Sequence, residues 1–339
     1  MNRKPVVRVV PYQPHCFAFG GFEIQMISAL AAVQAQGYDV EKMDFWSKDD
    51  GFDILHIWGY GLAHWPAAYW ARKSGKRVVM SALLPYPTFK CKVRSFISSR
   101  YGIGRAHKEL LDLVDYVSVV NEQQAEMATR ILGVPDSKVA VIPNVVDEKY
   151  FEPPPGLTPP IAIDRYILCT GNVCPRKNQL ALSQACIAAN VPLLIIGDVL
   201  LGEEAYGESL SLLIQEAPSI TWIRKVEPGS DVLIAAYQYC AAFALPSLNE
   251  TQPISLLEAS ALKKPLLAAD RPYAKQKYYA NALLVDPESV ADIRRGVEQV
   301  IENGAMHVTP YKTIEDCRFS NVGIAYGRVF ESLMEKSSF

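Results

Sequence analysis

Short apolar runs alternate with longer stretches of helical spacing along the whole chain. Runs of three to five residues rich in Val, Ile and Leu predict buried strands at residues 6–10, 53–57, 77–81, 116–120 and 138–142, and again at 166–170, 192–196, 220–223, 241–245, 265–268 and 283–285. Apolar spacing typical of helices separates them, as at residues 23–35, 122–132 and 179–189. This alternation predicts an α/β protein with two parallel sheets.

A proline-rich segment divides the pattern into two halves. Five prolines and a glycine fall between Pro153 and Pro160, and such a stretch can enter neither a helix nor a central strand. With 339 residues the chain is long enough for two domains of about 150 residues. We therefore expect domains at 1–150 and 166–320, joined by a linker at 151–165, and a terminal helix at about 321–336.

Composition and charge narrow the function classes. Half of the residues are apolar, and 34 Lys and Arg against 36 Asp and Glu leave a formal charge of −2. This excludes a largely disordered chain and disfavours a protein that binds nucleic acid over its whole surface. Seven scattered cysteines make a poor disulfide framework, and no apolar run reaches the roughly 18 residues of a membrane span. We expect a cytoplasmic protein.

Several catalytic motifs are missing from the sequence. No G-x-G-x-x-G follows a predicted strand, and the residue before Lys177 is Arg176, where a Walker A motif needs Gly. The five histidines have no H-E-x-x-H spacing, and there is no G-x-S-x-G. These absences disfavour a nicotinamide dehydrogenase, a P-loop nucleotidase, a zinc hydrolase and a serine esterase, and we expect neither a metal site nor a bound cofactor.

The loop after the strand at 166–170 carries two adjacent cations, Arg176 and Lys177, just before a predicted helix. Cations oppose the dipole at a helix N-terminus, so their position favours a site that an anion such as phosphate occupies. The alternative is a solvated basic turn.

The loop after the strand at 241–245 carries two carboxylates. Pro253 suits the first position of the following helix, which places Glu250 in the loop and Glu258 about one turn inside the helix. Carboxylates can accept hydrogen bonds from the vicinal hydroxyls of a sugar. Alternatively, Glu250 is a solvated loop acid and Glu258 forms a capping box with Ser255.

Two segments of the first half also follow strands. Gly20 and Gly21 allow backbone N–H groups to approach a phosphate closely, and Glu23 could cap the start of the following helix. The alternative is an ordinary flexible turn. His56 and Trp58 could meet a sugar at the acceptor side, where an aromatic ring can stack, or they could pack in the core.

Residues 88–108 contain six cations and no acid, interleaved with aromatic residues. Such a stretch is attracted to an anionic membrane surface, at about 1 kcal/mol for each cation. It predicts peripheral contact with the inner face of a membrane, unless it is a solvated face beside a cleft that binds an anionic ligand.

The spacing Glu250 to Glu258, within PSLNETQPISLLEASALKKPLLAAD, resembles the E-x7-E signature of GT4-type retaining glycosyltransferases, which have the GT-B fold. The resemblance covers the whole chain. GGFEIQMISALAAVQAQGYDV is similar to the opening loop and helix of the family, DYVSVVNEQQAEMATRILGVPDSKVAVIPNVVDEKYF to its interdomain approach, and GNVCPRKN and LLIIGD occupy the expected places. The resemblance implies two Rossmann-like domains facing each other across a cleft, with the terminal helix packed on the first.

The resemblance also implies roles for individual residues. Lys177 and Arg176 would face the diphosphate of a sugar nucleotide, Glu258 its ribose, and Glu250 the hydroxyls of its sugar. The loop and helix start at Thr251, Gln252, Pro253 and Ile254 would offer backbone N–H groups. Gly20 and Gly21 would approach the diphosphate from the first domain. The family requires no bound metal, and positive side chains stabilise the departing nucleoside diphosphate.

Three positions depart from the pattern of the family. Asn172, in the donor-binding loop, stands where Arg is usual, and Leu83 stands where many members have His. The third departure is the loop at 251–253, which is poorer in glycine than usual.

We therefore expect a retaining, metal-independent hexosyltransferase. Its donor would be a UDP- or GDP-hexose, and its acceptor a glycan or lipid-linked glycan of a cell-surface polysaccharide or lipopolysaccharide. The alternatives are a sugar-nucleotide epimerase or a phosphorylase-like enzyme of the same fold, and a non-catalytic partner subunit.

Overall fold

The computed structural model describes residues 3–16, 20–87, 102–163 and 165–335. These form two compact units, which are described separately. Unit 1 comprises Met1–Val145 and Phe319–Phe339, and unit 2 comprises Val146–Arg318.

Unit 1 is built on a six-stranded parallel sheet with the strand order β2-β1-β3-β4-β5-β6. Its strands are β1 (Val6–Val10), β2 (Asp39–Lys42), β3 (Ile54–Trp58), β4 (Arg77–Ser81), β5 (Tyr116–Val119) and β6 (Val139–Val141). Strand β2 is absent from the sequence-based prediction. It lies at the edge of the sheet, and only Val40 among its four residues is buried, so it lacks the apolar run that marks the inner strands.

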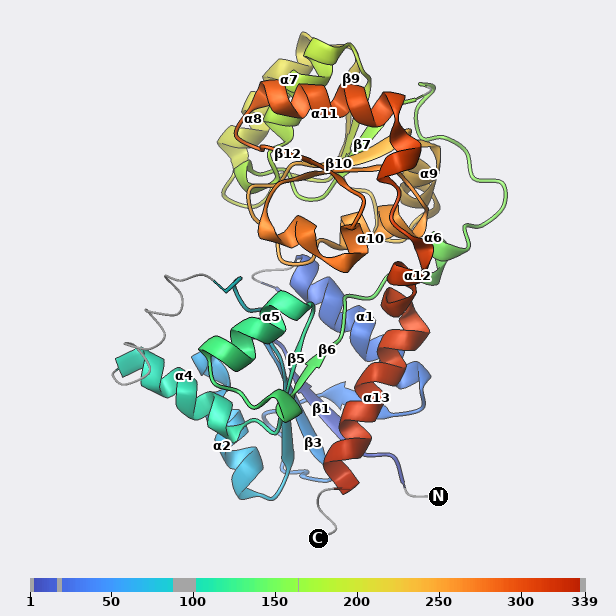
Figure 1. Cartoon of the computed structure of the whole chain (residues 1–339). Coiled ribbons are helices and arrows are strands. Elements are labelled where there is room, and N and C mark those ends of the chain that lie inside the picture. Colours follow the sequence, from blue (N-terminus) through green and yellow to red (C-terminus); the bar gives the residue numbers. More distant parts are fainter. Residues whose placement is uncertain (1–2, 17–19, 88–101, 164, 336–339) are drawn as a thin grey trace. The chain divides into compact units, whose positions relative to one another are not determined.

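Helices cover both faces of this sheet (Figure 1). They are α1 (Gly21–Ala35), α2 (Trp65–Lys73), α4 (Gly102–Leu113), α5 (Glu122–Glu126) and α13 (Phe319–Glu335), with a π-helical turn η2 (Met127–Ile131) continuing α5 and short 3-10 turns η1 (Leu62–His64) and η3 (Asp136–Lys138). One core cluster joins α1 and α13 to the sheet, and a second joins α2, α4 and η2 to it. Each face of the sheet therefore has its own apolar core.

The C-terminal helix α13 is an integral part of unit 1. It packs along α1 so closely that a Cβ atom on Gly323 would lie 2.3 Å from the carbonyl oxygen of Ala32. Phe330 is fully buried against the sheet, and Tyr38 donates a hydrogen bond of 2.6 Å to Glu331. The chain thus returns to its first unit after completing the second.

Unit 2 contains a second six-stranded parallel sheet, with the order β12-β11-β10-β7-β8-β9. Its strands are β7 (Ile167–Thr170), β8 (Leu193–Ile196), β9 (Ile220–Ile223), β10 (Ala242–Leu245), β11 (Leu266–Ala269) and β12 (Leu283–Val285). All residues of β7, β8, β10 and β11 are buried, as expected for parallel strands covered on both faces.

The helices of unit 2 are α6 (Glu148–Phe151), α7 (Gln179–Ala189), α8 (Glu204–Gln215), α9 (Asp231–Tyr239), α10 (Ile254–Ala261), α11 (Val290–Glu302) and α12 (Tyr311–Ile314). Short 3-10 turns complete it: η4 (Pro175–Lys177), η5 (Pro272–Lys275), η6 (Lys277–Tyr279), η7 (Gly304–His307) and η8 (Glu315–Cys317). The predicted α/β fold with two parallel sheets is confirmed.

The proline-rich stretch lies within unit 2, although the sequence analysis expects it to separate the domains. The chain passes between the units at Val145 and Val146, before this stretch begins. Helix α6 contacts α10, and the hydroxyl of Tyr239 in α9 donates a hydrogen bond of 2.7 Å to the carbonyl oxygen of Leu157. The prolines therefore form a surface segment attached to unit 2.

Candidate functional site

The order of the strands in the sheet of unit 2 predicts where a ligand binds. Counted from β9, the strands run in the order third, second, first, fourth, fifth and sixth, so the winding direction reverses between β7 and β10. In sheets of this kind, ligands bind beyond the carboxyl ends of the strands where the direction reverses. The loops that follow β7 and β10 contain the predicted residues Lys177 and Glu250.

Backbone conformation shapes the loop after β7. Gly171 has a φ of +123°, which favours glycine, and a Cβ atom there would lie 3.3 Å from the Cε atom of Lys177. After the turn η4, Asn178 adopts a left-handed conformation, and its side-chain amide donates to the carbonyl oxygens of Pro246 and Pro287. The backbone N–H of Leu248 donates to the carbonyl oxygen of Arg176 at 2.8 Å. The two loops are therefore held together by their own hydrogen bonds.

Two cations converge on one carboxylate in these loops. The Oε1 atom of Glu250 lies 2.8 Å from Nζ of Lys177 and 2.6 Å from Nη1 of Arg176. The side chains of Lys177 and Glu250 are each 11% exposed, and that of Arg176 is 47% exposed. Burial raises the pKa of Glu250, but the charges and hydrogen bonds of Lys177 and Arg176 outweigh it, so that its pKa lies below the ordinary value. Glu250 is therefore not a solvated loop acid and Lys177 is not a solvated cation, whereas Arg176 remains half exposed.

Glu258 belongs to helix α10, which begins at Ile254 directly after Pro253. Ser255 therefore lies inside the helix, and Glu258 is not part of a capping box. Instead its Oε2 atom accepts a hydrogen bond of 2.7 Å from the hydroxyl of Tyr237 in α9. Burial raises the pKa of Glu258 to about 7, although the phenols of Tyr237 and Tyr150 act in the opposite direction.

A group of hydroxyls next to Glu258 has no counterpart in the residues predicted from the sequence. The Tyr237 hydroxyl also lies 2.6 Å from Oγ1 of Thr170, the last residue of β7. The ring of Tyr150 in α6 meets that of Tyr237 edge to face, with centroids 5.5 Å apart. Both tyrosines come from segments whose apolar spacing predicts only core packing, so a single sequence offers no signal for this role.

The remaining donor-loop residues surround these charges. Gln252 is buried, and its side-chain amide donates a hydrogen bond to Oε1 of Gln276. The Nε2 group of Gln276 donates to the carbonyl oxygen of Thr251 at 2.7 Å. The carbonyl oxygen of Pro253 accepts from the hydroxyl of Tyr279. Asn172 is exposed, and its carbonyl oxygen accepts a hydrogen bond from Gln179. The site thus joins two cations, an ionised carboxylate and a second carboxyl group with a pKa near neutrality.

In unit 1 the predicted glycine loop forms hydrogen bonds with neighbouring residues of the chain. Gly20 immediately precedes α1, and its N–H donates to Oε2 of Glu23 at 2.9 Å, while Oε1 accepts from Gln13. Gly21 begins the helix, with no atom within 4 Å of the place where a Cβ would be. Glu23 therefore caps the helix.

His56 and Trp58 lie inside unit 1, on β3. They are 1% and 0% exposed, and Nε2 of His56 lies 2.8 Å from Oγ of Ser81. Burial lowers the pKa of His56 to about 3. This position favours core packing over contact with an acceptor. Leu83, which follows β4, is 43% exposed.

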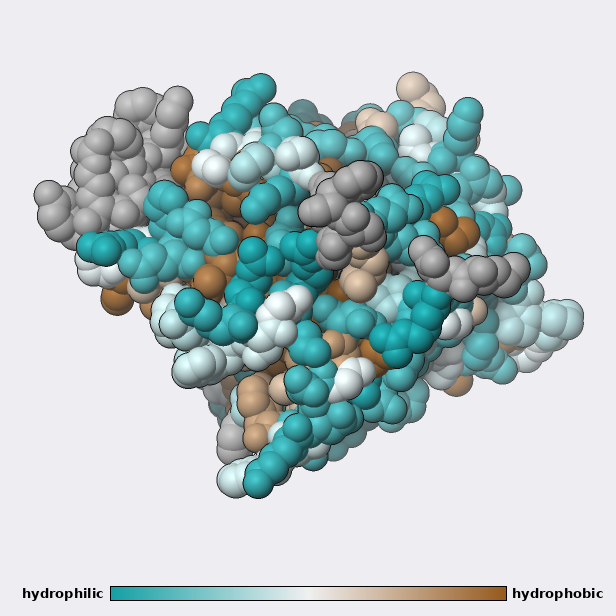
Figure 2. All heavy atoms as spheres, turned by 90° about the horizontal axis from the view of Figure 1, so that it is seen from below, coloured by the Kyte–Doolittle hydropathy of each residue, from teal (hydrophilic) through white to brown (hydrophobic). Residues whose placement is uncertain are grey.

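Most of the basic stretch expected to contact a membrane, residues 88–101, lies outside the described residues. Its last part lies in α4, where Arg105 and Lys108 form ion pairs with Glu109 and Asp112. No helix among the described residues is long and apolar enough to cross a membrane. On the face seen in Figure 2, hydrophilic side chains cover most of the surface, with hydrophobic patches between them.

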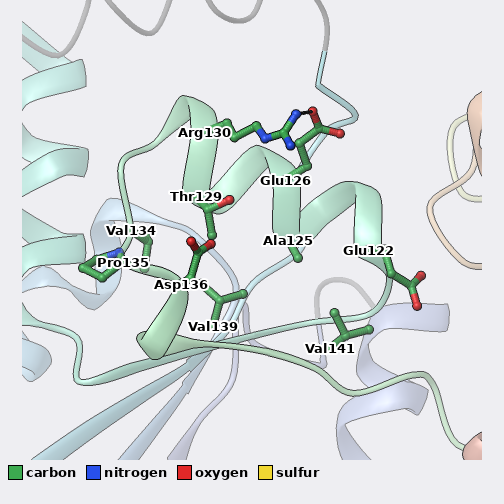
Figure 3. Close-up of a pocket in the computed structure, with 10 residues that line it drawn as sticks. All are labelled: Glu122, Ala125, Glu126, Thr129, Arg130, Val134, Pro135, Asp136, Val139 and Val141. Carbon is green, nitrogen blue, oxygen red and sulfur yellow. Dashed lines mark hydrogen bonds and ion pairs between the residues drawn. The ribbon is translucent and has the colours of Figure 1, made fainter.

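A separate hollow of about 600 Å³ opens in unit 1 between α5, η2 and β6 (Figure 3). Its wall includes Glu122, Ala125, Glu126, Thr129, Arg130, Val134, Pro135, Asp136, Val139 and Val141. Arg130 donates to Glu126 across one side at 2.8 Å. None of the predicted site residues lies here. Within the described part of the chain, no group of three or more His, Cys, Asp or Glu side chains is arranged to hold a metal ion.

The solved structures with which the chain shares its fold include three of similar length. A glycosyltransferase from Rickettsia africae has a TM-score of 0.74 at 15% identity, with 98% of this chain and 99% of that chain covered. Sucrose-phosphate synthase from Thermosynechococcus elongatus has a TM-score of 0.72 at 15% identity, with 98% and 100% covered. HepE from Anabaena, in complex with UDP and glucose, has a TM-score of 0.69 at 15% identity, with 99% and 100% covered.

Family models match both units, whereas no curated protein matches the chain in sequence. The model of Glycosyltransferase Family 4 matches residues 19–150, and that of glycosyl transferases group 1 matches residues 161–315. The two matches fall on unit 1 and unit 2 and together cover most of the chain. The chain therefore belongs to the GT4-type glycosyltransferases with the GT-B fold.

Proposed function

We propose that this glycosyltransferase is a retaining enzyme that transfers a hexose from UDP- or GDP-hexose to a glycan or lipid-linked glycan. The observation that carries the proposal is the ion-paired group of Lys177, Arg176 and Glu250 beside Glu258, at the point where the sheet of unit 2 reverses its direction. This arrangement offers positive charge for a diphosphate and carboxylates for hydroxyls.

Each residue then has a role that follows from its chemistry. Glu258 binds the ribose hydroxyls, and Lys177 with Arg176 binds the diphosphate. Glu250 accepts hydrogen bonds from the hydroxyls of the sugar, and the start of α10 at 251–254 presents backbone N–H groups to sugar and phosphate. Because Lys177 already contacts Glu250, it lies where it can hold the sugar-binding carboxylate and a phosphate oxygen together.

The two cations also support the chemistry of transfer. Negative charge grows on the diphosphate as the glycosidic bond breaks, and fixed positive groups in a site shielded from water stabilise it strongly. Lys177 and Arg176 supply that charge without a bound metal. The acceptor oxygen bonds to the anomeric carbon on the face from which the diphosphate leaves, and the departing phosphate accepts the proton of the acceptor hydroxyl, so the configuration of the sugar is retained.

The structural neighbours support a nucleotide-sugar donor. HepE forms complexes with UDP and with UDP-glucose, and one neighbour is a UDP-forming trehalose-phosphate synthase. We place the reaction in cell-surface polysaccharide or lipopolysaccharide synthesis at the cytoplasmic face of a membrane, with residues 88–108 as its contact.

Proton NMR of the purified protein with UDP-glucose or GDP-mannose tests this proposal. Slow hydrolysis, with water as acceptor, should first release the α-anomer of the sugar, and Glu250→Gln should release it more than tenfold more slowly because it weakens contacts to the sugar. First release of the β-anomer would contradict retention. Nucleotide binding without release from any donor would favour the non-catalytic alternative.

A further inference from the structure

We propose that Tyr237 is a positioning residue for Glu258, fixing its carboxylate so that the remaining acceptor positions meet the two ribose hydroxyls of the donor. This inference rests on the proposed function, because it assigns the ribose to Glu258. Its first support is contact: the Tyr237 hydroxyl lies 2.7 Å from Oε2 of Glu258 and 2.6 Å from Oγ1 of Thr170.

The chemistry of a carboxylate fixes the direction of these hydrogen bonds. Ionised Glu258 can only accept, so the proton of the Tyr237 hydroxyl points toward it. The oxygen of Tyr237 is then an acceptor for Thr170, whose hydroxyl must donate to it. A directed chain therefore runs from the end of β7 through Tyr237 to Glu258.

Counting acceptor positions links this chain to the ribose. A carboxylate has about four lone-pair positions, and Tyr237 donates to Oε2 of Glu258. The positions that remain are enough to accept from a pair of neighbouring hydroxyls. The Tyr237 hydroxyl thus selects one orientation of the carboxylate before the donor arrives.

Neighbouring side chains hold the ring of Tyr237 in a fixed position. Its side chain is fully buried, its ring stacks on Phe243 with centroids 5.3 Å apart, and Tyr150 packs edge to face against it. Such a ring cannot turn away from Glu258 without disturbing its neighbours. A hydroxyl held in this way loses little freedom when the ligand binds.

The same contacts make ribose binding depend on pH. Tyr237 comes from α9, Tyr150 and Asp147 from the α6 segment, and Lys177 from η4. Both phenols and Lys177 favour the ionised form of Glu258, whereas burial and Asp147 oppose it, and the resulting pKa is about 7. Loss of the Tyr237 hydroxyl therefore raises the pKa of Glu258 and reduces the ionised fraction at neutral pH.

The test is isothermal titration of Tyr237→Phe with UDP or GDP, whichever the wild-type protein binds more tightly, between pH 6 and pH 8.5. We expect affinity about three- to tenfold below wild type at pH 7, with a recovery toward wild type at pH 8.5. Thr170→Val should shift the pH profile in the same direction by a smaller amount. In a Glu258→Gln background, Tyr237→Phe should cause no further loss.

Two controls separate positioning from general damage. Tyr166→Phe also removes a buried hydroxyl, one that donates to the carbonyl oxygen of Ala236 in α9 at 2.8 Å, and it should leave both affinity and pH profile unchanged. The 2′,3′-dideoxy analogue of the same nucleotide keeps the titrating phosphates but lacks the ribose hydroxyls, so Tyr237→Phe should not alter its affinity.

An unchanged affinity and pH profile of Tyr237→Phe for the ribonucleotide would overturn the inference, and so would an equal loss for the dideoxy analogue. Absence of binding to the wild-type protein would instead overturn the proposed function itself. These outcomes are distinguishable because the wild-type titration precedes the others.

Discussion

Two glutamates of the candidate site have the same carboxyl group but opposite pKa shifts, because their surroundings differ. Glu250 and Glu258 are eight positions apart on adjacent segments, yet cations lower the pKa of one and burial raises that of the other. The first is suited to remain ionised among phosphates and sugar hydroxyls. The second has a pKa near neutrality, so its charge near pH 7 depends on the hydroxyls around it.

The buried side chain of His56 should make the free energy of unfolding depend on pH. Its pKa of about 3 lies below the roughly 6.5 of an unfolded chain, so below pH 6.5 the unfolded state takes up a proton that the folded state refuses. The free energy of unfolding should fall by about 1.4 kcal/mol for each pH unit between about pH 6 and pH 4 through this group. Above pH 6.5 the contribution is fully present.

Thermal unfolding of His56→Gln between pH 4 and pH 7 measures this contribution. The free energy of unfolding of the variant should fall less steeply toward acid pH than that of wild type. The difference in slope should correspond to about one bound proton. His107→Gln, on the partly exposed surface of α4, is the matched control and should follow the wild-type slope. The same slope for His56→Gln would contradict the assignment.

The charged residues of the site can be predicted from the sequence, but the hydroxyl-bearing residues around Glu258 cannot. Lys177 and Glu250 stand in loops after strands, where a parallel sheet collects its functional groups, so their proximity is predictable. Tyr237, Thr170 and Tyr150 are brought to Glu258 only by the packing of α6 and α9 on the sheet. The periodicity of each segment indicates burial and cannot indicate a partner far away in sequence.

At the scale of elements, the site depends on how closely two strand ends approach. Gly171 and Gly197 directly follow strands β7 and β8, and Gly197 has a φ of +147°. A Cβ atom on Gly197 would lie 2.1 Å from the carbonyl oxygen of Gly171. A Cβ atom on Gly171 would in turn lie 3.3 Å from Cε of Lys177. Glycine at 197 is therefore needed for the shape of the loop that carries Lys177.

Gly197→Ala should destabilise the protein by about 3 kcal/mol, because it combines an unfavourable φ with a backbone clash. It should also weaken nucleotide binding, since the clash moves the loop that carries Lys177. Gly202→Ala is the control: its φ is +88° with no atom within 4 Å, so only the strain of about 1 kcal/mol applies. Denaturant unfolding of both variants tests this difference, and equal losses would contradict it.

Strands were easier to predict than the boundaries between units. Buried apolar runs mark every inner strand to within one residue at each end, because both faces of a parallel sheet are covered. The edge strand β2 has only one buried residue and leaves no such mark. Likewise the prolines of 153–160 exclude regular structure, but they do not reveal that the segment is attached to α9.

At the scale of the whole molecule, the chain builds two α/β units, and the charged residues of the candidate site lie in one of them. Unit 2 contains every charged residue proposed to bind the donor. Unit 1 is completed by α13, which the chain delivers after unit 2 is finished. The family models match both units.

The most direct test of the proposed donor site is the affinity of the purified protein for UDP, GDP and ADP, measured by calorimetry for wild type, Lys177→Ala and the control Lys312→Ala, at an exposed position of α12. We predict selective binding of UDP or GDP, a loss of tenfold or more for Lys177→Ala because a buried charge-assisted contact to phosphate disappears, and wild-type affinity for Lys312→Ala. Unfolding temperatures of the three proteins show whether each is folded. Wild-type protein that binds none of the nucleotides, or folded Lys177→Ala that binds them as tightly as wild type, would contradict the account.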